Sequence, residues 1–363
     1  MHILHVVGAR PNFMKAAPVC RAMADAGLRQ TLVHTGQHYD DRMSAVFFDE
    51  LGLPKPDLDL DVGSGSHAAQ TAEVMKRFEP VVLDRRPDWV MVYGDVNSTM
   101  AATLVCVKLG IRVAHVEAGL RSGDRTMPEE INRLVTDQLA DLLLTHSPEC
   151  ARHLAREGVD AAKVTLVGNT MIDTLARLRP RSESMWPDLK AALGLKEDAE
   201  YALVTLHRPS NVDDPERLAA IVAALEEIGR TLPVLFPVHP RTSAQLRAHA
   251  IAVPASVRMI EPQGYLSFSA LQAHARVVIT DSGGVQEETT YLQVPCLTLR
   301  ATTERPVTIS DGTNTLIGEN PRDLIPAVAS ILEGWTPSGR RPPLWDGQAG
   351  LRIARLFTSG RQT

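Results

Sequence analysis

The sequence predicts an α/β protein with two Rossmann-like domains. Two observations carry this prediction: short apolar runs alternate with helical patterns along the chain, and the alternation is interrupted once, near residues 178–200. Such alternation is typical of βαβ units, in which helices cover both faces of a parallel sheet. Before the interruption, the apolar runs cover residues 2–7, 30–35, 89–93, 112–116, 142–145 and 164–167.

A second series of apolar runs covers residues 202–206, 234–238, 257–260, 277–279 and 295–299. A helical pattern resumes at 346–357, so we expect a C-terminal helix that crosses back to the first domain. We therefore divide the chain into a first domain at 1–178, a linker region at 179–200, a second domain at 201–340 and a C-terminal helix at 341–363.

The composition is ordinary for a soluble globular protein, with 44% hydrophobic and 22% charged residues. Its 363 residues can supply two domains, each with a buried core. The net charge of −5 argues against a nucleic-acid-binding protein. The four cysteines form no Cys-x-x-Cys pair, and the sequence shows neither a signal peptide nor a membrane-spanning apolar segment. We expect a reduced, cytoplasmic protein that binds neither nucleic acid nor membrane.

The Asp-Ser-Gly-Gly turn at residues 281–284 is the strongest local signal. It lies between an expected strand and an expected helix, where two glycines let the backbone approach an anion and the helix N-terminus favours phosphate. Glu287 and Glu288 in the next turn would repel free phosphate but can accept hydrogen bonds from ribose hydroxyls. The turn therefore predicts a nucleotide or nucleotide-sugar site, and a glycine turn with two capping acids is the alternative.

Charged residues follow several of the expected strands, and active sites in parallel sheets lie at the carboxyl ends of strands. Arg10 and Lys15 follow the first apolar run, and both cations could reach a diphosphate. Solvation of a helix start is the alternative for both. Asp95 follows the run at 89–93, where it could cap a helix or supply an acid to the site.

Glu117 directly follows another apolar run, and a carboxylate at the end of a buried parallel strand must be paired or functional. Glu129 and Glu130 occupy the first turn of an expected helix, where acids are stabilising without any chemistry. His207 and His239 follow two strands of the second half. A histidine there is more often a satisfied polar group than a ligand.

Several of these segments belong to a set of short motifs that occur in one particular order along the chain. They are Gly8-Ala9-Arg10-Pro11, Thr35-Gly36-Gln37-His38, Gly94-Asp95, His115-Val116-Glu117-Ala118-Gly119-Leu120-Arg121, Pro128-Glu129-Glu130, Asp281-Ser282-Gly283-Gly284, Thr303-Glu304-Arg305-Pro306 and Asp346-Gly347-Gln348-Ala349. In these motifs the chain resembles the non-hydrolysing UDP-N-acetylglucosamine 2-epimerases over residues 1–357. The resemblance implies a GT-B-like fold, two Rossmann-like domains facing a deep cleft, a UDP-sugar substrate and a homodimer.

The resemblance also implies roles for individual residues, and it implies no metal and no other cofactor. The residues that match the family's catalytic group are Asp95, Glu117, Glu129 and His207. The residues that match its substrate-binding group are Arg10, Lys15, Gln263, Phe268, Ser282, Gly283, Gly284, Glu288 and Arg305. Tyr39 and Pro209 stand where many bacterial members have arginine, which puts regulation by a second substrate molecule in doubt.

The stereochemistry of this substrate requires two proton-transfer groups. The C1–O and C2–H bonds of UDP-N-acetylglucosamine are trans-diaxial, so UDP and the C2 proton can leave by anti elimination to 2-acetamidoglucal. For the manno epimer, UDP must return to its original face while a proton reaches C2 from the opposite side. One carboxylate cannot do both. Because no carbonyl acidifies C2–H, cleavage of the C1–O bond must be more advanced than loss of the C2 proton in the transition state. Cations that stabilise the departing diphosphate assist this cleavage.

Three alternatives remain open on the sequence. They are a GT-B glycosyltransferase, an epimerase of a modified UDP-HexNAc such as a UDP-diacetamido-uronic acid, and a UDP-sugar sensor without turnover. A nicotinamide enzyme is disfavoured, because residues 8–11 are not GxGxxG and the glycines at 63–66 follow no convincing strand. Zinc is disfavoured because His115, His207 and His239 lack metal-site spacing.

Overall fold

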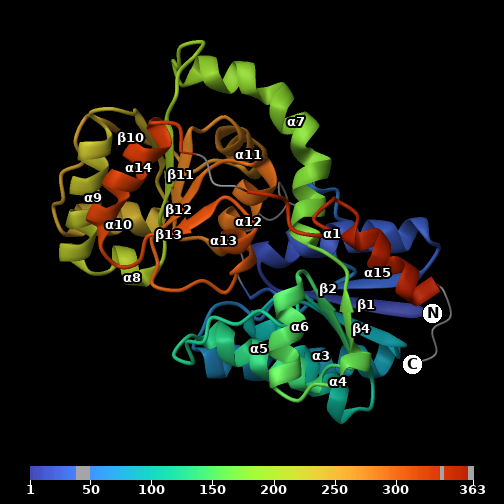
Figure 1. The fold of residues 1–363 in the computed structure, drawn as a ribbon. Coiled ribbons are helices and arrows are strands. Elements are labelled where there is room, and N and C mark those ends of the chain that lie inside the picture. Colours follow the sequence, from blue (N-terminus) through green and yellow to red (C-terminus); the bar gives the residue numbers. More distant parts are fainter. Residues whose placement is uncertain (38–49, 336–338, 359–363) are drawn as a thin grey trace. The chain divides into compact units, whose positions relative to one another are not determined.

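The computed structural model describes residues 1–37, 50–335 and 339–358. These residues form two compact units, of which the first comprises Met1–Arg177 and Pro343–Thr363 and the second comprises Leu178–Pro342. Each unit contains one parallel sheet with helices around it (Figure 1). Tyr39 lies outside the described residues.

The first unit is built on a seven-stranded sheet in the order β3-β2-β1-β4-β5-β6-β7, with every neighbouring pair parallel. Four of the strands, β1, β4, β5 and β6, have the bounds that the sequence predicts. The strands are β1 (His2–Val7), β2 (Arg29–His34), β3 (Leu58–Asp59), β4 (Trp89–Tyr93), β5 (Arg112–Val116), β6 (Leu142–Thr145) and β7 (Val164–Leu166).

Helices cover this sheet and bury its strands, which explains why the strands read as continuous apolar runs. Leu4 and Val6 of β1 pack with Phe78 and Ala102 from two of these helices. The helices are α1 (Arg10–Asp25), α3 (His67–Arg85), α4 (Asn97–Lys108), α5 (Pro128–Leu139), α6 (Pro148–Arg156), η1 (Ala161–Lys163), α15 (Ala349–Thr358) and the first part of α7 (Thr170–Ala192).

The single helix α7 occupies much of the segment for which the sequence predicts a linker region. It contains Pro180 and Pro187, each of which removes one backbone hydrogen bond of the helix. The boundary between the two units falls within this helix, between Arg177 and Leu178. Neither α7 nor any other helix in the described ranges is long and apolar enough to span a bilayer.

The second unit is built on a six-stranded parallel sheet in the order β10-β9-β8-β11-β12-β13. Ala202 and Val204 of β8 face one hydrophobic core, whereas Leu203 faces another. This alternation is the period of two expected for a strand buried on both faces. The strands are β8 (Ala202–Thr205), β9 (Val234–Pro237), β10 (Val257–Ile260), β11 (Val277–Thr280), β12 (Cys296–Thr298) and β13 (Asn314–Leu316).

Two groups of helices cover the two faces of this sheet (Figure 1). Leu218, Leu246 and Val328, from α9, α10 and α14, pack in the first core. Leu271 and Val285, from α11 and α12, pack in the second core. The helices are α8 (Pro209–Val212), α9 (Pro215–Ile228), α10 (Pro240–Ala248), α11 (Tyr265–Ala273), α12 (Gly283–Leu292), α13 (Val307–Ser310), η2 (Pro321–Asp323) and α14 (Leu324–Leu332).

The strand order of each sheet changes direction at one pair of neighbouring strands. These pairs are β1 and β4 in the first unit and β8 and β11 in the second. Open α/β sheets bind their ligands beyond the carboxyl ends of strands at such switch points. The residues that follow these strands include Gly8 and Gly94 in the first unit, and His207 and Asp281 in the second. The topology therefore directs attention to the segments that carry the sequence motifs.

The C-terminal helix α15 packs on α1, at a point where α1 contains a proline. Pro18 has no N–H to offer to the carbonyl of Met14, and the hydroxyl of Thr174 donates to this carbonyl instead, at 2.6 Å. A Cβ on Gly350 of α15 would lie 2.6 Å from the carbonyl oxygen of Pro18. Asp173 accepts two of the first backbone N–H groups of α15, at 3.0 and 2.7 Å. The predicted helix therefore packs on the first unit.

We expect Thr174→Val to lower the free energy of unfolding by about 1–3 kcal/mol, because it leaves the buried Met14 carbonyl without its donor. Urea unfolding measures this change. Thr103→Val is the matched control, since the buried hydroxyl of Thr103 also donates to a carbonyl, that of Thr99, at 2.8 Å. That carbonyl lies inside α4, where the helix ladder already satisfies it. Equal losses in the two variants would refute the role of Thr174.

Candidate functional site

Lys15 and Glu117 form a buried ion pair in the first unit. Lys15 Nζ and Glu117 Oε1 lie 2.7 Å apart, and the two side chains are only 6% and 3% exposed. Lys15 comes from the first turns of α1, and Glu117 directly follows β5. Charges removed from water are costly unless each has a partner, so the two groups satisfy one another at the carboxyl end of the sheet.

The backbone around this pair adopts uncommon conformations. Glu117 has a φ of 72°, a left-handed value that residues other than glycine rarely adopt. Strain of this kind accumulates at functional sites. Gly94 has a φ of 62°, and a Cβ there would lie only 2.7 Å from Lys15 Nζ. The glycine of the Gly94-Asp95 motif therefore provides the space that the lysine ammonium occupies.

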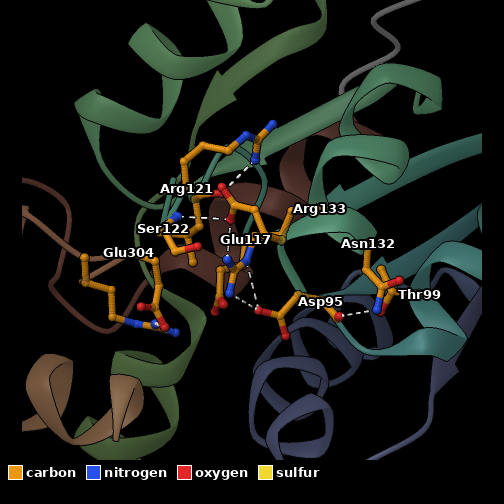
Figure 2. Close-up of polar contacts among 12 residues, drawn as sticks. Asp95, Thr99, Glu117, Arg121, Ser122, Asn132, Arg133 and Glu304 are labelled. Carbon is orange, nitrogen blue, oxygen red and sulfur yellow. Dashed lines mark hydrogen bonds and ion pairs between the residues drawn. The ribbon is translucent and has the colours of Figure 1, made fainter. Parts of the chain in front are cut away.

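Asp95 follows β4 in a second charged network (Figure 2). Arg133 of α5 donates to Asp95 Oδ2 from Nε at 3.0 Å and from Nη2 at 2.6 Å, and from Nη1 to Glu130 at 2.7 Å. Burial alone would raise the pKa of Glu130, but the N–H groups of Ser122 and Gly123 and the Arg133 guanidinium hold it below its ordinary value. Glu130 is buried, whereas the Asp95 side chain keeps 22% exposure. Asp95 is thus the accessible carboxylate of this network.

A third network supports the same strand ends from within. His115 Nδ1 lies 2.6 Å from Asp137 Oδ1, and His115 Nε2 lies 2.7 Å from the carbonyl oxygen of Gly94. Arg121 contacts Asp137 and Glu157, each at 2.7 Å. Burial alone would raise the pKa of Asp137, but His115 and Arg121 lower it below its ordinary value. Both nitrogens of His115 are therefore engaged in holding the fold.

Two other predicted residues of this unit are Glu129 and Arg10. Glu129 stands half-buried in the first turn of α5, and among the described residues its carboxylate makes no hydrogen bond or ion pair. Arg10 begins α1, and its side chain lies outside the described part of the chain. The paired strands β4 and β5 thus present Asp95 and Glu117 at neighbouring ends, and the role of Glu129 stays a prediction.

One cluster near Glu117 has the ligand types of a metal site. His146 follows β6, Glu149 and Cys150 begin α6, and one ligand atom from each lies within 4.8 Å of the others. All three residues are buried. Burial lowers the pKa of His146, but Cys150, Glu117 and Glu149 outweigh it and raise the pKa above its ordinary value. The sequence did not single out this cluster, since Cys150 lies in a helix-like segment where cysteine usually acts as a small hydrophobe.

In the second unit, His207 and Asp281 follow the neighbouring strands β8 and β11. His207 Nδ1 lies 3.0 Å from Asp281 Oδ1; the His207 side chain is 42% exposed and that of Asp281 is fully buried. Asp281 also accepts the backbone N–H groups of His207 and Arg208 and the amide of Asn211. Burial alone would raise the pKa of Asp281, but His207 and these donors hold it below its ordinary value.

The Ser282-Gly283-Gly284 turn opens α12 as the sequence predicts. Ser282 is the N-cap residue, and its hydroxyl makes no capping hydrogen bond. A Cβ on Gly283 would lie 2.3 Å from Nη1 of Arg305, so only glycine lets this guanidinium approach the turn. The structure therefore brings Ser282, Gly283 and Arg305 together. Helix N–H groups and a guanidinium both favour an anion.

Arg305 belongs to a buried cluster of charges in which the sequence assigned no role to Arg208, Arg300 or Glu304. Glu304 lies 2.6 Å from Arg305 Nη1, 2.7 Å from Arg300 Nη2 and 3.5 Å from Arg208 Nη2. Arg305 Nε lies 3.0 Å from Glu287 Oε1. Burial alone would raise the pKa of Glu304, but the three arginines hold it well below its ordinary range. The sequence does contain a signal that could have identified Arg208 and Arg300 as site residues, because both closely follow predicted strands.

Glu288 is buried between two hydrogen-bond donors. Tyr265 donates its hydroxyl to Oε1 at 3.1 Å, and Gln272 donates its amide to Oε2 at 2.8 Å. Burial raises the pKa of Glu288 to about 7, and the neighbouring Glu287 adds to this shift. The predicted ribose ligand therefore already has a donor at each carboxylate oxygen.

We expect wild-type stability to fall as pH rises through 7 and Glu288→Gln to lack this component. The folded state binds the Glu288 proton more tightly than the unfolded state does, so the contribution is complete below about pH 4.5 and is lost through pH 7. Its size is on the order of 3 kcal/mol. Urea unfolding of both proteins between pH 5 and 8 measures the difference. Parallel stability curves would refute the raised pKa.

Gln263 and Phe268, predicted to lie near a uracil, stand at the start of α11. Gln263 is half-buried, and its amide donates to the carbonyl of Glu261 at 2.8 Å. Phe268 is half-buried and packs against the second core of the unit. Both side chains thus keep some exposure.

A family model described as UDP-N-acetylglucosamine 2-epimerase matches residues 21–358 of the chain. Among curated proteins, the UDP-N-acetylglucosamine 2-epimerase of Methanocaldococcus jannaschii is 41% identical over 99% of this chain and 100% of its own length. The UDP-2,3-diacetamido-2,3-dideoxy-D-glucuronate 2-epimerase of Pseudomonas aeruginosa is also 41% identical, over 98% of this chain and 99% of its own length.

A solved structure gives the same result. The crystal structure of the M. jannaschii UDP-GlcNAc 2-epimerase in complex with UDP-GlcNAc and UDP matches with a TM-score of 0.90 and 40% identity. The match covers 99% of this chain and 100% of that chain. It confirms the predicted α/β class with two Rossmann-like, GT-B-like units.

Proposed function

Because this chain belongs to the UDP-N-acetylglucosamine 2-epimerase family, we propose that it is an isomerase that interconverts UDP-N-acetylglucosamine and UDP-N-acetylmannosamine. The observation that carries this proposal is the placement of two acids, Asp95 and Glu117, at the ends of the paired strands β4 and β5. Each acid has a cationic partner, Arg133 or Lys15. A C2 epimerase that works by elimination needs two proton-transfer groups.

The second unit would bind the UDP part of the substrate. Ser282, Gly283 and Gly284 would offer backbone N–H groups and a hydroxyl to the diphosphate, and Arg305 would add a positive charge beside Gly283. The assigned ligands of the ribose and the uracil are Glu288, Gln263 and Phe268. Arg10 and Lys15 of the first unit would contact the substrate from α1.

The reaction would begin with cleavage of the C1–O bond and loss of the C2 proton to one of the two acids. Cations around the diphosphate stabilise the negative charge that develops on UDP in the transition state. Such electrostatic stabilisation by preorganised groups is usually the largest contribution to lowering the barrier. UDP then returns to C1, and the other acid, which must enter this step protonated, delivers its proton to the opposite face of C2 and is left as a carboxylate. An adjacent ammonium such as that of Lys15 favours an ionised carboxylate, the form that accepts a proton. Glu129 and His207 complete the assigned catalytic group.

A modified UDP-HexNAc is the second candidate substrate, because the P. aeruginosa relative is as similar as the M. jannaschii one. Comparison of kcat/KM for UDP-N-acetylglucosamine and UDP-2,3-diacetamido-2,3-dideoxy-D-glucuronate tests the choice. We expect the unmodified sugar to be the better substrate. A higher value for the uronate would transfer the proposal to that sugar, and release of UDP only in the presence of an added acceptor would favour a glycosyltransferase.

We further propose a cytoplasmic homodimer that supplies UDP-N-acetylmannosamine for cell-surface polysaccharide synthesis. An apolar groove of about 490 Å³ on the first unit supports self-association; its lining includes Met75, Met100 and Ile131, from α3, α4 and α5. Ile131 is 37% exposed, a large apolar side chain that a partner subunit could cover. Sedimentation equilibrium tests the dimer, and a mass equal to the 39.6 kDa of one chain would reject it.

A further inference from the structure

Asp281 contacts His207 in a way that distinguishes the two oxygens of its carboxylate. Oδ1 faces the ring nitrogen Nδ1 of His207 at 3.0 Å and also accepts the His207 backbone N–H, at 3.2 Å, which it shares with Oδ2. Oδ2 accepts three N–H groups, from the His207 backbone at 3.1 Å, the Arg208 backbone at 3.0 Å and the Asn211 side chain at 3.1 Å. Asp281 is fully buried, so these contacts are made away from solvent.

We propose that Asp281 is a positioning residue that keeps the proton of His207 on Nδ1, so that Nε2 is the nitrogen offered to the substrate. This inference rests on the proposed function, in which His207 belongs to the catalytic group. The ring is 42% exposed, whereas the carboxylate that holds it is buried. Because a carboxylate can only accept hydrogen bonds, a ring nitrogen 3.0 Å from its oxygen is favoured in the protonated form. The other nitrogen then accepts or donates a proton in the reaction.

The same residue ties the histidine to the predicted diphosphate turn. Asp281 immediately precedes Ser282, the N-cap of α12, and its own carbonyl accepts a hydrogen bond from Arg208 Nε at 2.9 Å. His207 and the turn thus share one buried anchor. A shift of Asp281 would displace the imidazole and the phosphate-binding N–H groups together.

The inequality of the two oxygens predicts what Asp281→Asn will do. The amide oxygen takes the place of Oδ2, because an amide NH2 there would face three N–H donors, whereas at the place of Oδ1 it would face only the shared backbone N–H of His207. The NH2 group then occupies the place of Oδ1 and donates to His207 Nδ1. This contact forces the proton of a neutral ring onto Nε2, the opposite tautomer.

The test is nitrogen-15 NMR of the full chain labelled at histidine, with the His207 signals assigned by their loss in His207→Ala. We expect the Nδ1–H tautomer in the wild type and the Nε2–H tautomer in Asp281→Asn. Asn211→Ala is the matched control, since it removes one contact to Oδ2 without touching the ring. It should keep the wild-type tautomer. The Nδ1–H tautomer in folded Asp281→Asn would overturn the proposal.

Kinetics supply the second readout. We expect Asp281→Asn to lower kcat for epimerisation about 100-fold or more, similar to His207→Ala, and the double variant to be no slower than His207→Ala alone. Losses that multiply in the double variant would mean that Asp281 acts independently of His207. If the wild type epimerises neither UDP-sugar, the proposed function fails, while the NMR tautomer still decides whether Asp281 positions the ring.

Discussion

Glu117→Gln should lower the turnover of UDP-N-acetylglucosamine epimerisation about 100-fold or more. The amide can still accept the hydrogen bond of Lys15, whose Nζ lies 2.7 Å from Glu117 Oε1, so the local geometry should survive. A carboxamide cannot take or return a proton, and the variant therefore removes the chemistry more than the fold. UDP binding, which we assign to the second unit, should be unchanged. Turnover and UDP affinity, measured on the same preparation, check both expectations.

Glu157→Gln is the matched control for this variant. Glu157 also pairs with a buried cation of the first unit, since its Oε2 lies 2.7 Å from Arg121 Nη2. We have assigned it no contact with the substrate, so its loss should leave turnover close to that of the wild type. A Glu117→Gln protein that folds and turns over at a near-normal rate would remove Glu117 from the mechanism.

Asp95→Asn should also lower turnover about 100-fold or more, since Asp95 is the other assigned proton-transfer group. Arg133, which contacts Asp95 Oδ2 through two nitrogens, keeps its ion pair with Glu130 in the variant. The loss should therefore lie in kcat more than in stability. Because we assign the two acids to opposite faces of C2, each variant should block formation of 2-acetamidoglucal from a different epimer. Product analysis from UDP-N-acetylglucosamine and from UDP-N-acetylmannosamine measures this.

Asp59→Asn provides the comparison for Asp95→Asn. Asp59 also stands at the carboxyl end of a strand, β3, and pairs with His34 at 2.9 Å. Its substitution should leave turnover nearly unchanged. If both aspartate variants lose activity equally, the effect of Asp95→Asn is a general effect of lost charge. If Asp95→Asn retains normal turnover, Asp95 is not a proton-transfer group.

Much of the fold can be predicted from the sequence because the strands are buried on both faces. Continuous apolar runs gave β1, β4, β5 and β6 with the observed bounds. The runs could not reveal β3 (Leu58–Asp59) or β13 (Asn314–Leu316), which are edge strands of two and three residues. Such short elements are set by pairing with a neighbour and not by their own pattern. The sequence predicts a linker at 179–200, where the structure continues α7 as far as Ala192, because Pro180 and Pro187 interrupt the helical pattern there.

Some residues of the candidate site could likewise be predicted from the sequence, and others could not. Lys15, Asp95 and Glu117 could be predicted because each is a charge at the end of an apolar run. Their partners could not, since the ion pair between Asp95 and Arg133 joins residues 38 positions apart along the chain. The cluster of Arg208, Arg300 and Glu304 is likewise made by tertiary contacts between segments that follow β8 and β12. The Asp281 carboxylate was visible in its motif, but its contact with His207 was not.

The central claim is proton exchange at C2, and proton NMR of the protein with UDP-N-acetylglucosamine in D2O tests it most directly. The sample is prepared without added metal or nicotinamide, and the anomeric and C2 signals are followed over time. We expect UDP-N-acetylmannosamine to appear with deuterium at C2, together with traces of 2-acetamidoglucal and UDP. A manno product that retains its original C2 proton would contradict the elimination mechanism, and an unchanged spectrum despite confirmed binding would reject this substrate.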